Sequence, residues 1–375
     1  MQYTEYELGE LLPFEQPTAY IVKSTDYSDA YATPVLTAGK SFILGKTNET
    51  DGIFDQLPVI IFDDFTTATQ FVNFRFKVKS SAMKILHINT DLVIPKYIFY
   101  RLQIIQFDHS THKRYWIQSY SKIKVLIPPL DEQFRIVARI EELFSELDKA
   151  VDTLKTTKEQ LAVYRQAVLK NAFSCLPETV EMDKIADMID PQPSHRTPPE
   201  YKNGIPYIGI GDIDYQNKKI NFEDARKVSP EVLDEHLHRY TIHKGDFVMG
   251  KIGTIGKPYK IPDEQNYALS ANVILIQPNK EKIYPEFLFW QFSSSLVTKQ
   301  LTLGAKATSQ PAFGIKKARL LSIKICELEK QFKIIKRLEA EMSCCDNIEK
   351  TVDTALAQAD AMRQSILKQA FEGTM

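Results

Sequence analysis

Residues 130–173 read LDEQFRIVARIEELFSELDKAVDTLKTTKEQLAVYRQAVLKNAF, and residues 328–371 read LEKQFKIIKRLEAEMSCCDNIEKTVDTALAQADAMRQSILKQAF. The two stretches align without a gap at an offset of 198 (328 − 130), and 17 of the 44 aligned pairs are identical. An internal repeat has to be found before other elements are assigned, because it fixes the order of the domains. The order here is variable block, long helix, variable block, long helix.

Both repeated stretches carry a heptad pattern, which predicts long helices that pair as a coiled coil. One apolar column of the first stretch is Ile140, Leu147, Leu154, Leu161 and Val168, and the other is Ile136, Leu143, Ala150, Thr157 and Tyr164. The second stretch repeats both columns, with Glu341 as a defect in one of them. We expect an intramolecular antiparallel pair, because two matched stripes in one chain meet at high effective concentration. An intermolecular coiled coil is the alternative.

The blocks before the two helices are rich in β-branched and aromatic residues, which predicts strands such as the single strand over 71–78. Residues 95–106 and 285–300 each predict a helix that begins with proline. The expected fold class is α+β, with two mixed, β-rich α/β globules separated by the two long helices in a pseudo-twofold arrangement. The expected domains are 1–129, 130–176, 177–327 and 328–375.

Composition indicates a soluble chain with two cores rather than a membrane or secreted protein. The 375 residues are 43% hydrophobic and 25% charged, and the four cysteines form no Cys-x-x-Cys pair, so a zinc site is not expected. The first residues lack the basic and apolar segments of a signal peptide, and no apolar run is long enough to span a bilayer. We therefore predict a cytoplasmic location.

The net charge of −1 does not announce a nucleic-acid-binding protein. The distribution of charge is more informative, since residues 287–326 contain six basic residues and no acidic one. Residues 92–130 contain six basic residues and a single acid, Asp108. The same bias thus precedes both helices, although two solvated faces without acids would give the same pattern.

No set of residues predicts catalysis. The Gly209-Ile210-Gly211 turn lacks the third glycine of a dinucleotide fingerprint, and the turn from Gly250 to Pro258 lacks the spacing of a phosphate loop. We read the latter as a β-turn with two lysines that suits a DNA backbone. Asp63-Asp64 and the pair His236 and His238, which would share one face only on a strand, are weak metal candidates. No metal site is therefore expected, and the chain is predicted to be a recognition or scaffolding protein rather than an enzyme.

The chain resembles the specificity subunits of type I restriction–modification systems. The resemblance rests on the opening of the first helix at 130–133 and on the closing segments 164–173 and 363–373. Residues 204–213 and 308–313 are similar to segments of the family's target recognition domains, and residues 34–40 look like a counterpart of the former. The second helix departs from the family pattern, because it opens without prolines and carries Cys344 and Cys345.

The resemblance implies that each block reads half of a bipartite DNA site, while the helices set the spacing and dock two modification subunits. Those partners would carry S-adenosylmethionine and methylate adenine, so no cofactor is expected in this chain. A motor–nuclease restriction subunit would join them to cleave unmodified double-stranded DNA.

Loops with lysine and polar residues are the expected DNA contacts. They are Lys40, Thr66, Thr67, Lys113, Arg114, Tyr115, Lys251, Thr254, Lys257, Lys306, Thr308, Ser309, Gln310, Lys316 and Lys317. Lysines would contact phosphates, whereas arginine, glutamine, serine and threonine would read base edges. Identical residues of the two helices are the candidates for partner binding: Gln133, Arg139, Arg165, Gln166, Gln331, Arg337, Arg363 and Gln364.

Two other functions remain open at this point. The first is a coiled-coil adaptor that joins proteins without touching DNA, which would lack a continuous basic surface across both blocks. The second is a nuclease built around Asp63-Asp64 and His236 with His238, which would show metal-dependent turnover.

Overall fold

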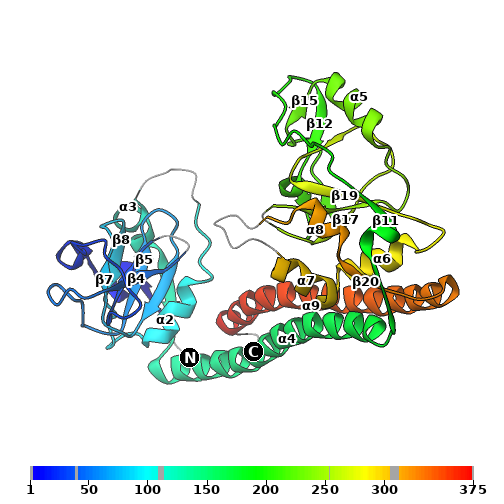
Figure 1. Ribbon diagram of the computed structural model, residues 1–375. Helices are drawn as coiled ribbons and strands as arrows, with labels where there is room; N and C mark the ends of the chain where they lie inside the picture. The colour runs from blue at the N-terminus through cyan, green and yellow to red at the C-terminus, as the bar shows by residue number, and fades with distance from the viewer. Residues whose placement is uncertain (1–2, 39–40, 109–113, 253, 305–311, 374–375) are drawn as a thin grey trace. The chain divides into compact units, whose positions relative to one another are not determined.

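The computed structural model describes residues 3–38, 41–108, 114–252, 254–304 and 312–373 (Figure 1). The chain forms two compact units. Unit 1 comprises Met1–Lys155 with Asp353–Met375, and unit 2 comprises Thr156–Val352. The predicted long helices are confirmed as α4 (Leu130–Ser174) and α9 (Leu328–Glu372), each 45 residues long. Each of them contributes one part to unit 1 and the other part to unit 2.

The globular part of unit 1 contains two sheets and a separate strand pair. The antiparallel sheet has the order β2-β8-β5-β6, the mixed sheet has the order β4-β3-β7, and β1 pairs with β9. The bounds of the strands and α-helices are β1 (Thr4–Glu7), α1 (Leu8–Leu11), β2 (Phe14–Glu15), β3 (Thr33–Leu36), β4 (Ile43–Thr47), β5 (Val59–Asp63), β6 (Thr69–Val72), β7 (Lys77–Val78), β8 (Met83–Leu86), α2 (Pro95–Leu102), α3 (Tyr115–Gln118) and β9 (Lys124–Ile127).

The globular part of unit 2 repeats this plan. Its antiparallel sheet has the order β11-β19-β16-β17, its mixed sheet has the order β15-β12-β18, and β10 pairs with β20. A hairpin, β13-β14, is additional. The bounds are β10 (Glu178–Glu181), β11 (Ala186–Ile189), β12 (Ile205–Ile208), β13 (Ile213–Asp214), β14 (Lys219–Ile220), β15 (Lys227–Val228), α5 (Pro230–Arg239), β16 (Phe247–Gly250), β17 (Pro258–Lys260), β18 (Ala268–Leu269), β19 (Val273–Pro278), α6 (Pro285–Phe292), α7 (Ser295–Gly304), α8 (Ile315–Arg319) and β20 (Ser322–Ile325).

The two globular parts therefore share one topology, although their central sequences do not visibly align. In each, the first strand of the mixed sheet pairs in parallel with a later two-residue strand, with Val35 opposite Lys77 in unit 1 and Tyr207 opposite Ala268 in unit 2. Within unit 2, the sheet that contains β19 and β17 lies between the helices and the sheet that contains β12 and β15 (Figure 1). The likeness proposed between residues 34–40 and 204–213 agrees with the equivalent places of β3 and β12.

Two predicted elements are wrong as single elements. The strand expected over 71–78 is two strands in different sheets, because the chain leaves β6 after Val72 and enters the mixed sheet at Lys77, opposite Val35. The helix expected over 285–300 is interrupted between α6 and α7. The hydroxyl of Ser294 donates to the carbonyl oxygen of Gln291 at 2.6 Å, and this local bond competes with continuation of the helix.

Each unit anchors its part of the long helices in its own core. Phe371 at the end of α9 packs on Tyr97 of α2 in unit 1, with ring centroids 5.2 Å apart. In unit 2, Phe173 at the end of α4 packs on Phe287 of α6 at 5.3 Å. Phe173 and Phe371 are repeat equivalents, so the same contact joins helix to globule twice. Burial of one such ring contributes about 1.5–3 kcal/mol.

The antiparallel pairing of the helices is confirmed within each unit. In unit 1, Ile140 of α4 packs with Leu367 and Ala370 of α9. In unit 2, the core that contains Phe173 also contains Leu338 of α9. Only one of the two predicted heptad columns is buried, since Tyr164 of the other column is 53% exposed and its repeat equivalent Met362 is 52% exposed.

Candidate nucleic-acid interface

The tight turn between β5 and β6 forms the first part of the candidate interface in unit 1. The Asp63 carboxylate accepts hydrogen bonds from the Phe65 amide at 2.9 Å and from the Thr66 hydroxyl at 2.6 Å. Thr67 follows in the left-handed region with φ 58°. This local network closes the turn and leaves Thr66 exposed at its tip. Asp63 is thus a turn residue, because both of its carboxylate oxygens accept bonds from the turn itself.

Helix α3 is held against this turn. The amide of Tyr115 donates to the Asp64 carbonyl oxygen at 3.0 Å, and the amide of Trp116 donates to the Asp64 carboxylate at 2.8 Å. That carboxylate is buried and lies 3.1 Å from the ammonium group of Lys84, which is buried too. Asp64 is therefore a structural residue, and it brings the exposed Arg114 next to the turn.

Tyr115 does not belong to the interface. Its side chain is 4% exposed, and its ring packs on Phe107 with centroids 5.0 Å apart. The prediction that Tyr115 contacts DNA is therefore wrong, because its ring fills the core of unit 1. The sequence could not decide this point, because an aromatic residue that follows basic residues at the start of a helix can pack in the core or stack on a base.

The turn between β16 and β17 occupies the equivalent place in unit 2. The turn folds back so closely that a side chain at Gly250 would meet the carbonyl oxygen of Thr254, and the Gly256 amide donates to the Gly250 carbonyl oxygen at 3.0 Å. The amide of Phe313 donates to the Lys251 carbonyl oxygen at 2.9 Å. This bond joins the turn to the segment that leads into α8, which carries Lys316 and Lys317.

The bond from Phe313 to Lys251 matches the bond from Tyr115 to Asp64. In unit 1 the donor, Tyr115, is the first residue of α3, and the acceptor, Asp64, directly follows β5. In unit 2 the donor, Phe313, lies two residues before α8, and the acceptor, Lys251, directly follows β16. Strands β5 and β16 hold the same place in the antiparallel sheets of the two units. The equivalent position holds an acid in unit 1 and a lysine in unit 2. The backbone geometry is thus kept while the charge is reversed.

Lys251 itself is not a free cation. It is 8% exposed, its ammonium group lies 2.6 Å from the Asp190 carboxylate, and it lies 3.4 Å from Nδ1 of His195. The predicted phosphate contact at Lys251 is therefore corrected, because DNA binding would have to break a largely buried ion pair. Its role is to hold the proline-rich loop against the turn.

The exposed polar groups of the unit 2 turn are Thr254 and Lys257. The Lys257 ammonium group lies 4.0 Å from the centroid of the Tyr215 ring, and the Tyr215 hydroxyl donates to the Lys257 carbonyl oxygen at 3.0 Å. Burial raises the pKa of Tyr215 to about 12, so the phenol stays protonated and remains a donor. Lys316 and Lys317 are exposed on α8, where Lys317 also donates to the Gly304 carbonyl oxygen at 2.7 Å.

Some predicted DNA contacts lie outside the described residues. They are Lys40, Lys113, Lys306, Thr308, Ser309 and Gln310. The described part of the candidate interface consists of Thr66, Thr67 and Arg114 in unit 1, and of Thr254, Lys257, Lys316 and Lys317 in unit 2.

Gln133 and Gln331, which were predicted to bind a partner, are fully buried. The Gln133 side chain accepts from the Ile94 amide at 2.8 Å and donates to the carbonyl oxygens of Leu92 and Pro128. The Gln331 side chain makes the same three bonds, with the Tyr284 amide and with the carbonyl oxygens of Lys282 and Cys326. That prediction is wrong, because both side chains are buried and each bonds three backbone groups. We call these two sets of bonds the glutamine clamps.

The other partner-binding candidates lie on the helix surface. Arg165 pairs with Asp346 and Glu349 at 2.7 Å each, and its repeat equivalent Arg363 pairs with Asp148. Arg139 pairs with Glu142, and Arg337 pairs with Glu341. The exposed Gln166 donates to the Ser293 carbonyl oxygen at 3.3 Å, and Gln364 is exposed. Since Asp148 and Asp346 are also repeat equivalents, the same ion pair joins α4 to α9 in both units.

The residues proposed for a metal-dependent nuclease have structural roles. His236 is fully buried on α5, a helix rather than a strand, and its ring nitrogens lie 2.8 Å from the Tyr240 hydroxyl and 3.0 Å from Oε1 of Gln192. Burial lowers the pKa of His236 to about 4. Nδ1 of His238 bonds the Asp234 carbonyl oxygen at 2.7 Å. Among the described residues, no three His, Cys, Asp or Glu side chains are placed to hold a metal ion.

The fold and this interface define a class of protein: two recognition domains of one topology, each joined to a pair of antiparallel helices. Residues 177–358 match the family model described as type I restriction modification DNA specificity domain. This match, together with the relatives described next, supports a specificity subunit of a type I restriction–modification system. None of its described helices is both long and apolar enough to cross a membrane.

Individual relatives agree with this family. The EcoR124I/EcoR124II specificity subunit of Escherichia coli is 45% identical over 174 residues, which cover 43% of this chain and 43% of that protein. The chain spans about half the length of the curated relatives it matches.

Solved structures show the same fold. One is a chain of a type I restriction–modification system solved to study its complex assembly and conformational transition, with a TM-score of 0.68 at 16% identity over 98% of this chain and 97% of that one. The HsdS subunit from Thermoanaerobacter tengcongensis gives a TM-score of 0.53 at 17% identity, over 100% of this chain and 97% of that one.

Proposed function

We propose that this chain recognises an asymmetric, bipartite DNA site, each unit reading one half of it. The observation that carries the proposal is the duplicated interface, in which a hairpin turn and the start of a short helix are joined by an equivalent backbone bond in both units. Two such surfaces with different side chains suit two different half-sites. This extends the DNA recognition that the match to the specificity-domain family supports.

The charged and polar groups at the duplicated interface fit two tasks in DNA binding: contact with phosphates and recognition of base edges. The net charge of the chain is only −1, so attraction to DNA has to come from local groups. The exposed Arg114, Lys257, Lys316 and Lys317 supply positive charge at the turns and short helices. Lysines would neutralise phosphates and set the register, while Thr66, Thr254 and the arginine would read base edges.

We further propose that the chain itself is not catalytic and acts through partners. Two modification subunits would bind it, carry S-adenosylmethionine and methylate adenine, and a restriction subunit would join them. The structural relative with the higher TM-score belongs to a study of complex assembly in a type I system, which supports an assembled state. The cytoplasmic location stays a prediction.

The test is to express the chain with the adenine methyltransferase subunit of the same system and to map methylated adenines in the host genome. We expect a single bipartite motif with a fixed spacer. The matched control expresses the methyltransferase with a chain in which Lys257, Lys316 and Lys317 are alanine, which should methylate the same motif less completely. Methylation that is independent of this chain would refute the proposal and favour an adaptor that does not touch DNA.

A further inference from the structure

A hairpin of unit 2, β13-β14, contacts both the turn between β16 and β17 and the long helix α9. Its two strands pair Ile213 with Ile220 and Asp214 with Lys219. The Ile213 side chain is buried in a core cluster of the globular part, and Ile220 packs against the same cluster. The base of the hairpin is therefore fixed to the sheets, and the loop 215–218 extends from this base.

The loop of this hairpin is stabilised by its own side chains. The Asp214 carboxylate accepts hydrogen bonds from the amides of Gln216 and Asn217 at 3.0 Å each, and from the Asn217 side chain at 2.7 Å. An aspartate that bonds the backbone two residues further on is typical of a turn. Lys218 closes the loop in the left-handed region with φ 52°. These local bonds restrict the loop that joins Tyr215 to Lys218.

The first residue of the loop, Tyr215, contacts the candidate DNA-binding turn. Its hydroxyl donates to the Lys257 carbonyl oxygen at 3.0 Å, and the centroid of its ring lies 4.0 Å from the Lys257 ammonium group. The ring also packs edge to face on Tyr259 of β17, with centroids 5.6 Å apart and an interplanar angle of 88°. Tyr215 therefore holds both the backbone and the side chain of the exposed lysine of this turn.

The last residue of the loop, Lys218, reaches the long helices. Its ammonium group lies 2.6 Å from the Asp346 carboxylate of α9, and Arg165 of α4 pairs with the same carboxylate at 2.7 Å. The space beside this contact is a pocket of about 710 Å³, whose lining includes Tyr215, Lys218 and Asp346. The Lys218 side chain thus crosses the edge of an open space, and it joins the loop to both helices through one aspartate.

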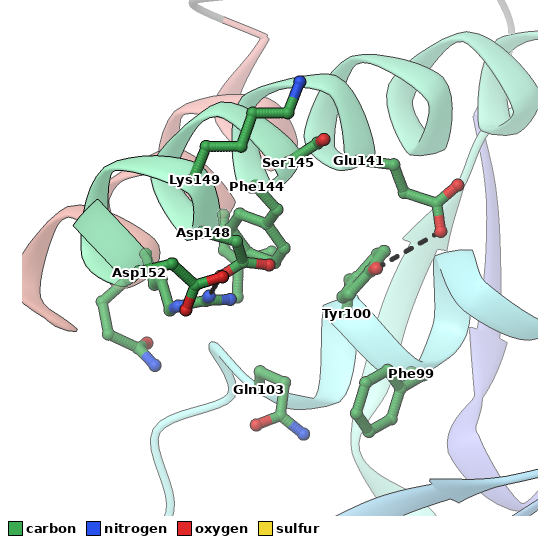
Figure 2. A pocket seen from close by; sticks show the side chains of 12 residues that line it. Phe99, Tyr100, Gln103, Glu141, Phe144, Ser145, Asp148, Lys149 and Asp152 are labelled. Atoms are coloured by element: carbon green, nitrogen blue, oxygen red, sulfur yellow. Dashed lines mark hydrogen bonds and ion pairs between the residues drawn. The ribbon is translucent and has the colours of Figure 1, made fainter. Parts of the chain in front are cut away.

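Among its described residues, unit 1 has no counterpart of this hairpin. The hairpin lies in the connection 209–226 between β12 and β15, whereas residues 37–42 join the equivalent strands β3 and β4. Figure 2 shows the equivalent place at the helices of unit 1, around Asp148, which is the repeat equivalent of Asp346. Asp148 pairs with Arg363, and the described lining of the pocket comes from α2, α4, α9 and the residue directly after α2. The connection between turn and helices is thus a feature of unit 2.

We propose that the β13-β14 hairpin positions the DNA-binding turn of unit 2 against the long helices, with Tyr215 and Lys218 as positioning residues. This rests on the proposed function, which assigns Lys257 to DNA phosphates. A free lysine side chain has many rotamers, and a phosphate contact has to overcome this entropy. Contact with the hairpin reduces the freedom of Lys257 before DNA binds. It also relates the position of this lysine to the helix pair and not to the turn alone.

The ion pair between the hairpin and α9 suits positioning better than stabilisation. The side chains of Lys218 and Asp346 are 73% and 46% exposed, and exposed pairs stabilise a fold only slightly. Replacement of Lys218 should therefore leave the thermal midpoint almost unchanged. A change in the DNA-binding turn of such a variant can then be assigned to the lost connection, because the chain remains folded.

Hydrogen exchange of the free chain tests this connection without DNA. Mass spectrometry follows peptides that contain Gly256, whose amide bonds the Gly250 carbonyl oxygen in the turn. We expect Lys218→Ala to speed exchange there by up to about fivefold, which is the limit for loss of an exposed ion pair. Lys218→Arg keeps the charge and should restore slow exchange. The matched control is Lys219→Ala, an exposed neighbour with the same loss of charge, which should exchange like the unsubstituted chain.

A double-mutant cycle tests whether Lys218 acts through Lys257. Fluorescence anisotropy measures the affinity and salt dependence on a duplex that carries the motif mapped by methylation. Lys218→Ala should weaken binding by less than Lys257→Ala does, and Tyr215→Phe, which removes only the hydroxyl bond, should resemble Lys218→Ala. Adding Lys218→Ala to Lys257→Ala should change the affinity by less than about twofold, because the positioned group is already absent. Two independent phosphate contacts would instead multiply their effects and lower the salt slope by about 2.

Two results would overturn the proposal. The first is unchanged exchange in the turn for both Lys218→Ala and Tyr215→Phe, at an unchanged thermal midpoint. The second is multiplied effects of Lys218→Ala and Lys257→Ala on DNA affinity, since Lys218 would then bind a phosphate itself. Failure of the proposed function gives a different result. The unsubstituted chain would then bind no DNA, while Lys218→Ala would still speed exchange in the turn.

Discussion

Buried polar side chains do much of the positioning at the scale of single residues. In each glutamine clamp the side-chain amide accepts one hydrogen bond and donates two, and these bonds tie the start of a long helix to the loop before a short helix. Asp64 and Lys251 position the two turns through backbone oxygens while their side chains form buried or largely buried ion pairs. These groups cannot be replaced without leaving unpaired backbone polar groups or an uncompensated charge.

Replacement of Gln133 or Gln331 by alanine should lower the free energy of unfolding by about 1–3 kcal/mol for each backbone group left unpaired in the interior. Urea unfolding followed by circular dichroism measures this change. The control is Gln364→Ala, an exposed position that should shift stability by less than about 0.5 kcal/mol. Equal effects of Gln133→Ala and Gln364→Ala would contradict the assigned role of the clamp.

His236 predicts a pH dependence of stability. Its pKa in the folded chain is about 4, below the ordinary value of 6.5, because burial disfavours the charged ring. Between pH 6.5 and 4 the unfolded chain binds a proton that the folded chain does not. The free energy of unfolding should therefore fall as the pH falls through this window, by up to about 1.4 kcal/mol per pH unit.

The measurement for His236 is a series of urea titrations at pH 7 to 4. His236→Asn should flatten the dependence, whatever its effect at pH 7, while the exposed His238→Ala should retain it. A slope that survives His236→Asn unchanged would assign the dependence to other groups.

At the scale of elements, α4 and α9 are joined by apolar contacts and by the repeated arginine–aspartate pair. The pairs are partly exposed, with side-chain exposures of 25% and 46% for Arg165 and Asp346. Partly exposed pairs stabilise a protein by only about 0.2–1 kcal/mol. Their main effect is to fix which part of one helix lies beside which part of the other.

A charge exchange tests this element. Asp148→Arg places two arginines together and should lower the thermal midpoint, while Asp148→Arg with Arg363→Asp should recover most of the loss. The expected coupling energy in the double-mutant cycle is about 1 kcal/mol or less, and it should shrink in high salt. A coupling of zero at low salt would show that the pair does not contribute to helix pairing.

The sequence predicts the long helices well because a repeat of 44 residues carries many independent signals. It does not reveal the shared topology of the globular parts, because their strands are short and their turns differ in length. The change of sheet between β6 and β7 is set by pairing with β3, which no local pattern encodes. One sequence signal could have predicted the glutamine clamps. Gln133 and Gln331 lie one heptad before Ile140 and Leu338, on the same apolar column of each helix. A polar residue on that column indicates a satisfied interior amide.

At the scale of the whole molecule, two lysines that the sequence predicts to contact DNA in the same way have different surroundings in the structure. Lys251 and Lys257 lie in the same turn, yet one is in a largely buried ion pair and the other is exposed. The identity of a lysine predicts charge, whereas its role depends on the partner that the fold places beside it.

The two lysines should therefore respond differently to substitution. Lys257→Ala should weaken binding of all DNA sequences and reduce the slope of log K against log salt by about 1. Lys251→Ala should instead lower the stability of unit 2, because it leaves Asp190 without its cation. Fluorescence anisotropy with duplexes at several salt concentrations, together with thermal unfolding, separates the two. An unchanged salt slope for Lys257→Ala would remove this residue from the interface.

The glutamine clamps also bear on how such a protein can acquire a new target. Both clamps bond only backbone groups: an amide and a carbonyl oxygen of the loop before a short helix, and the carbonyl oxygen of Pro128 or Cys326 just before the long helix itself. A globular part that contains such a loop can thus be joined to either long helix without a matching change in side chains. Genetic exchange at this junction would produce chains with new pairs of half-site readers that still fold.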